Sequence, residues 1–202
     1  MELLLCCAVL AIMASMLLPA YRRALAQSLT LRCRNHLHQL GLATDLYSED
    51  NCGVLPHKDD GDTKPPHHIR WNNVLDVEPY NVPPYEGGHK SRDGYDLKMN
   101  SRIEDYKGSK SYYSPVFRHV DSVRQPEITP LYFDGRVDTK YHRERPFGFF
   151  NAVDPRHDGE AMILFMDYGA RPIWGVPDLD GGWKDAGELT WDPDAELNDQ
   201  LP

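Results

Sequence analysis

The sequence predicts an α+β protein in which one long N-terminal helix packs against a small antiparallel sheet. Two observations predict this fold. The chain opens with an apolar run that continues into a one-sided apolar pattern, and two later stretches of β-favouring residues lead into turns that contain aspartate and glycine. With 202 residues, 41% of them hydrophobic, the chain can supply a membrane anchor and one domain of ordinary size.

The helix begins with residues 3–20, eighteen positions without a charged side chain. A run of this length is close to what is needed to cross the hydrocarbon core of a bilayer. After Pro19, apolar residues recur at three- and four-residue steps, which is typical of one face of an amphipathic helix. These residues are Leu25, Leu29, Cys33, Leu37, Leu40, Ala43 and Tyr47.

Asn51 and Gly53 predict the C-terminus of the helix, and Pro56 prevents the helix from resuming. The chain therefore divides into three parts. Residues 1–20 form a hydrophobic transmembrane or filament-core segment, residues 21–52 form its amphipathic continuation, and residues 53–202 form a globular head.

Glu2 and Pro19 lie seventeen residues apart, and residues 33–43 read C-R-N-H-L-H-Q-L-G-L-A, followed by Tyr47 and by D-N-C-G-V-L-P at residues 50–56. These features resemble the N-terminal segment of type IV pilins and type II secretion pseudopilins. The resemblance implies a non-enzymatic structural subunit that crosses the bacterial inner membrane once, with its head outside the cytoplasm. It further implies two partners, an inner-membrane assembly platform and copies of the same chain in a helical filament.

The resemblance also implies assembly roles for Glu2 and Pro19. A carboxylate in an apolar helix is costly in lipid unless it meets a partner. In filaments of this family the corresponding glutamate faces the N-terminal amine of an adjacent subunit, although a carboxylate that reaches the lipid headgroups is the alternative. Family precursors carry a basic leader before this segment, whereas Met1 directly precedes Glu2 here, so leader cleavage and N-methylation stay open.

Charge and cysteine content set further limits. A net charge of −9 argues against nucleic acid as the main partner. The segment after the apolar run carries arginines at 22, 23, 32 and 34, and an excess of positive charge is typical of the cytoplasmic side of a membrane. The family resemblance places this segment outside the cytoplasm instead.

Cys33 and Cys52 would be roughly 28 Å apart on a continuous helix, so a disulfide between them would require the helix to end early. We interpret Cys33 as a core residue.

The chain between the helix and the sheet is predicted to be irregular. His57, His67 and His68 would fit a metal site, but they lack regular ligand spacing, which favours solvent-exposed loop histidines. Trp71 and Leu75 are predicted to pack on the helix. Residues 81–111 are rich in proline, glycine and charge, and we expect a surface excursion there.

Two hairpins are predicted in the head. The first joins residues 128–133 to residues 136–141 through Asp134-Gly135, and the second joins residues 161–166 to residues 170–174 through Asp167, Tyr168 and Gly169.

These segments again resemble the pseudopilin-like subfamily. Its C-terminal signature separates a histidine from an Asp-Gly pair by nine residues, and His157 and Asp167 keep that spacing, although Tyr168 displaces the glycine to Gly169. His157 with Asp134 and Asp167 would fit a catalytic or metal-binding constellation. The interpretation that we favour is structural: the aspartates bond backbone N–H groups of their own turns, and His157 bonds a carbonyl. On this reading no catalytic residue is assigned, and Asp134, Gly135, His157, Asp167 and Gly169 are turn residues of the family motif.

The C-terminal segment 176–202 is rich in acidic residues and glycine. Asp178, Asp180 and Asp185 are candidate calcium ligands, and the family resemblance supports that possibility because major pseudopilins carry calcium near the C-terminus. The spacing does not fit an EF-hand, and an acidic solvated tail without any cofactor is the interpretation that we prefer.

The sequence thus favours a subunit of a type IV pilus-like or type II secretion pseudopilus filament. The alternative from a different class is a membrane-tethered extracytoplasmic enzyme or binding module that uses the region of His157 and Asp167.

Overall fold

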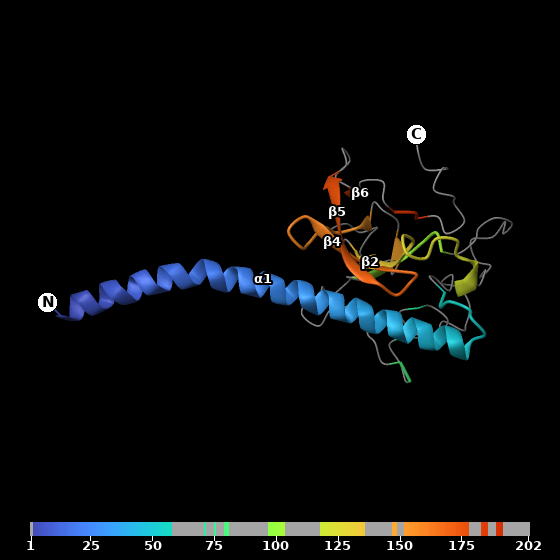
Figure 1. Cartoon of the computed structure of the whole chain (residues 1–202), viewed down its shortest axis with the longest axis horizontal. Helices are drawn as coiled ribbons and strands as arrows, with labels where there is room; N and C mark the ends of the chain where they lie inside the picture. Colours follow the sequence, from blue (N-terminus) through green and yellow to red (C-terminus); the bar gives the residue numbers. More distant parts are fainter. Residues whose placement is uncertain are drawn as a thin grey trace, which may run out of the picture.

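A computed structural model describes residues 2–57, 71, 75, 79–80, 97–103, 118–135, 147–148, 152–177, 183–185 and 189–191, with the backbone alone at residues 2, 3, 5, 8, 9, 147–148, 176–177 and 183–185. The elements in chain order are α1 (Glu2–Asp50), β1 (Leu97–Asn100), the 3-10 helix η2 (Val120–Ser122), β2 (Pro130–Asp134), β3 (Phe147–Gly148), β4 (Glu160–Phe165), β5 (Ala170–Pro177) and β6 (Trp183–Asp185). The predicted α+β layout is confirmed: one long helix lies against a small sheet (Figure 1).

Helix α1 has 49 residues, which corresponds to about 74 Å at 1.5 Å per residue. Its C-terminal part lies along the sheet, and its N-terminal part extends well beyond the head (Figure 1). Pro19 lies inside α1 and does not interrupt it. Within the described residues, no helical stretch combines the length and the apolar character that a membrane crossing requires.

The predicted end of α1 is confirmed. The side-chain amide of Asn51 donates to the carbonyl of Tyr47 at 2.8 Å, and the N–H of Gly53 donates to the carbonyl of Ser48 at 2.7 Å. Cys52 and Gly53 both have positive φ, 57° and 80°, as expected where a chain reverses after a helix. Cys33 and Cys52 are free thiols, in agreement with a helix that continues to Asp50.

The strands are ordered β3-β1-β2-β4-β5-β6, and the pairs from β1 through to β6 are antiparallel, whereas β3 runs parallel to β1. The predicted hairpin around Asp167 is confirmed as β4 and β5. The predicted hairpin at Asp134-Gly135 is wrong, because β2 pairs with β1 on one side and with β4 on the other. Its expected second strand, residues 136–141, lies outside the described residues.

Two further expectations are corrected. Strand β1 lies within residues 81–111, where we expected an irregular excursion; its four residues do alternate between apolar and polar, but the run is short and the residues around it are rich in proline, glycine and charge. The C-terminal segment is not simply a solvated tail, because β6 pairs with β5 and the side chains of Leu189 and Trp191 are buried. The remaining residues of both segments lie outside the described part of the chain.

The sheet carries a hydrophobic core on each face. Along β4, Met162 and Leu164 belong to the core shared with α1, whereas Ala161, Ile163 and Phe165 belong to the core on the far face. This alternation is the period of two that a strand imposes on its side chains. The far-face core is completed by Ala152, Val153, Leu189 and Trp191.

The apolar stripe predicted on α1 is confirmed only in its C-terminal half. Its buried members are Cys33, Leu37, Leu40 and Ala43, and Tyr47 is partly buried against them. Leu25 and Leu29 are instead 50% and 46% exposed, because the head covers α1 only from about the turn of Thr30 onward. Trp71 and Leu75 pack in the same core as these helix residues, as predicted.

Gly41 allows α1 to approach the sheet closely. A Cβ atom at this position would lie 3.1 Å from a methyl carbon of Leu164 on β4. Next to it, the hydroxyls of Thr44 on α1 and Tyr132 on β2 are 3.1 Å apart in the buried core. The ring of Tyr132 also lies against that of Trp71, with 4.9 Å between the ring centroids.

We expect Thr44→Val to lower the free energy of unfolding by about 1–3 kcal/mol, because the buried Tyr132 hydroxyl loses this partner. Adding Tyr132→Phe to Thr44→Val should restore part of the loss, since both polar groups are then gone. Urea denaturation of the two variants and the parent protein measures the difference. A double variant that is less stable than Thr44→Val would contradict this role of the pair.

The contact of α1 with the head should weaken at alkaline pH. Burial, followed by the nearby Asp45 carboxylate, raises the pKa of Tyr168 to about 12. An unfolded tyrosine ionises near pH 10, so the folded state binds more protons between about pH 10 and pH 12, and stability must fall as the pH rises through that window. Tyr168→Phe should flatten this decline in denaturation measured at about pH 9 and about pH 11, whereas an unchanged slope would exclude Tyr168 as a source.

Candidate functional site

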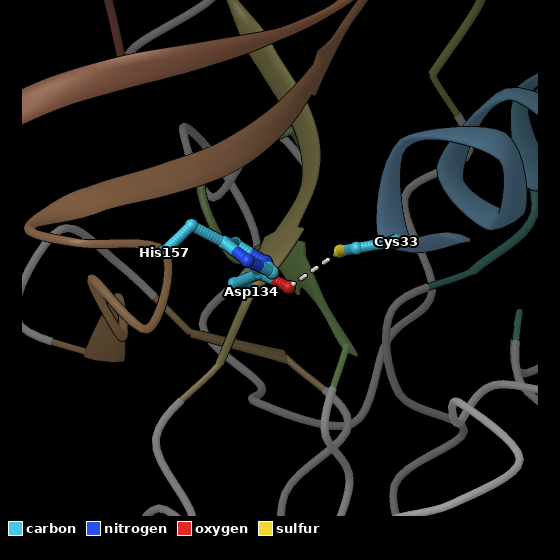
Figure 2. Close-up of side chains that lie close together, drawn as sticks. All are labelled: Cys33, Asp134 and His157. Carbon is cyan, nitrogen blue, oxygen red and sulfur yellow. Dashed lines mark hydrogen bonds and ion pairs between the residues drawn. The ribbon is translucent and has the colours of Figure 1, made fainter. Parts of the chain in front are cut away.

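Three side chains from distant parts of the sequence meet where α1 first contacts the sheet. Cys33 projects from α1, Asp134 is the last residue of β2, and His157 precedes β4 (Figure 2). The thiol of Cys33 donates to Oδ1 of Asp134 at 3.1 Å, and Nε2 of His157 lies 3.2 Å from Oδ2 of the same carboxylate. We call these three residues the Cys-Asp-His cluster.

A tight turn positions His157. Asp158 and Gly159 both have positive φ, 55° and 94°, as the two central residues of a type I′ turn require. His157 and Glu160 exchange backbone hydrogen bonds of 3.1 and 3.0 Å across this turn. A Cβ at Gly159 would also lie 3.2 Å from the ring of Trp174, so glycine suits both the conformation and the space.

The backbone around Asp134 is fixed to the segment that leads to His157. The N–H of Asp154 donates to the carbonyl of Asp134 at 2.9 Å, and the guanidinium of Arg156 donates to the carbonyl of Gly135 at 2.7 Å. A side chain on Gly135 would collide with Lys98 of β1. Asp134 and His157 are thus held in register by the chain between Asp154 and Arg156.

Thr30 extends the cluster along α1. Its hydroxyl lies 3.2 Å from Nδ1 of His157 and 3.1 Å from the carbonyl oxygen of Ala26. When the hydroxyl donates to that carbonyl, its oxygen accepts from an Nδ1–H group of His157. Both ring nitrogens of His157 therefore face polar partners on the helix or on β2.

The structure revises the roles expected for the two aspartates. Asp134 is fully buried, and its carboxylate accepts from the N–H of Met162 on β4 at 2.9 Å and from Cys33, not from its own turn. His157 contacts Asp134 and Thr30, where we expected a carbonyl partner. Asp167 agrees with the structural interpretation, because its exposed carboxylate accepts from the N–H of Gly169 at 2.9 Å.

The additional residue in the Asp167 turn has a conformational consequence. The backbone of Tyr168 has a positive φ of 60°, whereas that of Gly169 does not have a positive φ. Tyr168 thus adopts the left-handed conformation that glycine tolerates more easily. Its ring packs against the helix-facing core, which supports this conformation.

The other candidates of the sequence lie elsewhere. His57 is buried, not solvent-exposed as expected, and its carbonyl accepts from the N–H of Trp71 at 2.7 Å. His67 and His68 lie outside the described residues, as do Asp178 and Asp180 and the side chains of Asp185 and Glu2. Pro19 lies inside α1, in the exposed stretch of the helix before Thr30.

The cluster has the chemistry of a metal site more than that of a nucleophile. Cys33 and Asp134 are fully buried, and the His157 side chain is 8% exposed, so a substrate has little access. The thiol of Cys33 donates to a carboxylate, and a negative neighbour disfavours the thiolate that a cysteine nucleophile requires. One sulfur, one oxygen and one nitrogen atom lie within 4.8 Å of one another, a set that can hold a metal ion.

Cys33 was missed as a site residue because its apolar spacing on the helix explained it fully. One signal did exist: Cys33, Asp134 and His157 each lie in a different one of the motifs that resemble the pseudopilin subfamily.

Comparisons of the chain with models of protein families, with curated proteins and with solved structures find no match.

We expect Asp134→Ala to lower the free energy of unfolding by about 2–5 kcal/mol, because it leaves two buried donors, the N–H of Met162 and the thiol of Cys33, without their acceptor. Asp167→Ala removes one exposed turn contact and should cost about 0.5–1.5 kcal/mol. Chemical denaturation of the two variants measures both losses. Equal losses would show that the buried carboxylate does not hold α1 on the sheet.

Proposed function

We propose that the protein is a structural subunit of a type IV pilus-like or type II secretion pseudopilus filament that assembles through the projecting part of α1. One observation carries the proposal: large apolar side chains are exposed over most of this part of the helix. They are Leu4, Leu10, Ile12, Met13, Met16, Leu17, Leu18, Tyr21, Leu25, Leu29 and Leu31.

The extent of this exposure is unusual for an isolated chain. Met16 is 72% exposed and Leu17 65% exposed. Burying one such side chain stabilises a structure by about 1.5–3 kcal/mol, so the free energy available from the whole surface is large. Contiguous apolar surface of this kind indicates a protein or membrane partner.

The shape of the molecule favours copies of α1 as the final partner. The head covers only one end of the helix, so the projecting part is accessible from every side (Figure 1). Packing of several such helices would bury their apolar side chains together and leave the heads outside. In this proposal the bacterial inner membrane holds the same surface before assembly, with the head outside the cytoplasm.

Glu2 completes the proposal at the N-terminus of α1. We propose that its carboxylate meets the N-terminal amine of a neighbouring subunit, as the family resemblance implies. Such pairing would compensate a charge that is costly among apolar helices and would set the register between subunits.

The enzyme or binding-module alternative has one observation in its favour, the Cys-Asp-His cluster. The side chains of that cluster are buried, and Asp167 bonds its own turn. An activity lost in His157→Ala or Asp167→Ala without loss of folding would favour this alternative.

Replacing Leu10, Met13 and Leu17 together with serine should reduce filament yield at least about tenfold, because three apolar side chains no longer gain from burial. Sedimentation and electron microscopy of the purified full-length chain measure the yield. Trp174→Ser is the control, since Trp174 is an exposed apolar side chain of the head. Comparable yields for the triple serine variant and the parent would contradict assembly through α1.

Glu2→Ala and Glu2→Lys should leave a folded protein that assembles poorly, with the lysine variant more affected because it places two positive charges together. Circular dichroism checks folding, and the same microscopy measures assembly. Unchanged filament yield in both variants would remove Glu2 from the assembly mechanism.

A further inference from the structure

We propose that Cys33, Asp134 and His157 bind one divalent transition metal ion of the zinc class, which ties α1 to the sheet. Nothing in the assembly proposal requires this site, and the two can fail separately. The proposal rests on three features of the cluster: its donor atoms, their spacing and the hydrogen bonds behind His157.

The donor atoms select the class of metal. Thiolate, imidazole and carboxylate are the three ligand types that zinc uses in proteins, whereas calcium and magnesium take oxygen ligands. A thiolate from Cys33 and the carboxylate of Asp134 would together balance a 2+ charge. A neutral complex can be buried at much lower cost than an isolated ion.

The spacing of the donors already approaches that of a tetrahedral site. Metal–ligand bonds of about 2.0–2.3 Å place neighbouring ligand atoms about 3.3–3.7 Å apart. The Cys33 sulfur is 3.1 Å from Oδ1, and His157 Nε2 is 3.2 Å from Oδ2 of Asp134. These two contacts are to different oxygens of the carboxylate, and the three donor atoms all lie within 4.8 Å of one another. Side-chain movements of up to about 1 Å would therefore bring them to tetrahedral spacing.

The hydrogen bonds of Thr30 suit a metal-binding histidine. A histidine that binds a metal through Nε2 commonly donates its Nδ1–H to an oxygen acceptor. Thr30 Oγ1 lies 3.2 Å from Nδ1 and can in turn donate to the carbonyl of Ala26 at 3.1 Å. This arrangement fixes the proton on Nδ1 and leaves the Nε2 lone pair for the ion.

Binding exchanges protons for the metal. The thiol proton of Cys33 passes to solvent, and the sulfur forms a bond to the ion in place of its hydrogen bond to Asp134. Three protein ligands would leave a fourth position for water. The three side chains come from α1, the end of β2 and the turn before β4 (Figure 2), so an ion held by them would bridge these elements.

Cobalt(II) provides the test, because a thiolate ligand gives it a charge-transfer absorption band. The full-length chain carries Cys6, Cys7 and Cys52 as well, and all three are exposed. The parent for the titration is therefore the chain with these three cysteines replaced by serine, which leaves Cys33 as its one thiol. We expect one equivalent of cobalt to produce the band, zinc to displace it, and zinc to raise the melting temperature.

The variants separate a metal site from a hydrogen-bonded cluster. Cys33→Ser should abolish the band, His157→Asn should abolish it or weaken binding, and Thr30→Val should weaken binding about 10–100-fold. His38→Asn is the matched control, because His38 lies exposed on the same helix. Circular dichroism establishes that each variant is folded.

Two results would overturn the proposal. The first is a folded parent that shows no thiolate band with cobalt and no stabilisation by zinc. The second is a band that survives in folded His157→Asn with unchanged affinity, since the thiol would then bind cobalt without the cluster.

Discussion

The contact between α1 and the sheet is the interaction on which the rest of the structure depends. A helix of 49 residues is far longer than the sheet that it crosses, so the head can cover only one end of it. In the covered part, Cys33, Leu37, Leu40 and Ala43 are buried, and Gly41 lets the helix lie close to β4. The uncovered part keeps its apolar side chains exposed, and from this division we infer a subunit that completes its burial with other molecules.

The boundary between the two parts of α1 coincides with the Cys-Asp-His cluster. Among the described residues, Thr30 and Cys33 are the first positions of α1 that are not fully exposed, and both contact the head through polar atoms. Separation of α1 from the sheet breaks the hydrogen bond from Cys33 to Asp134 and the contact of Thr30 with His157, whereas the bond from the N–H of Met162 to Asp134 holds β4 to β2.

The sequence predicted what depends on local pattern and missed what depends on tertiary pairing. The ends of α1 followed from apolar periodicity and from Gly53, and the β4–β5 hairpin from its apolar flanks. The Asp-Gly pair at residues 134 and 135 was interpreted as a hairpin turn, but β2 is a central strand that already has β1 and β4 as its neighbours. A different Asp-Gly pair, Asp158-Gly159, forms the type I′ turn. Strand β1 was missed because its alternation of apolar and polar residues spans only four positions within a stretch rich in proline, glycine and charge. Cys33 was missed because the apolar stripe of the helix already accounted for it.

Photocrosslinking from the projecting helix tests the central claim most directly. A photoreactive phenylalanine at position 17 of the full-length chain, compared with the same group at position 174 on the head, reports which molecule lies against α1. If the helix is a shared spine, the crosslinks from position 17 join two copies of the chain within residues 4–31, and position 174 gives few of them. Crosslinks from position 17 that reach only lipid or the head of the same molecule would contradict assembly through α1.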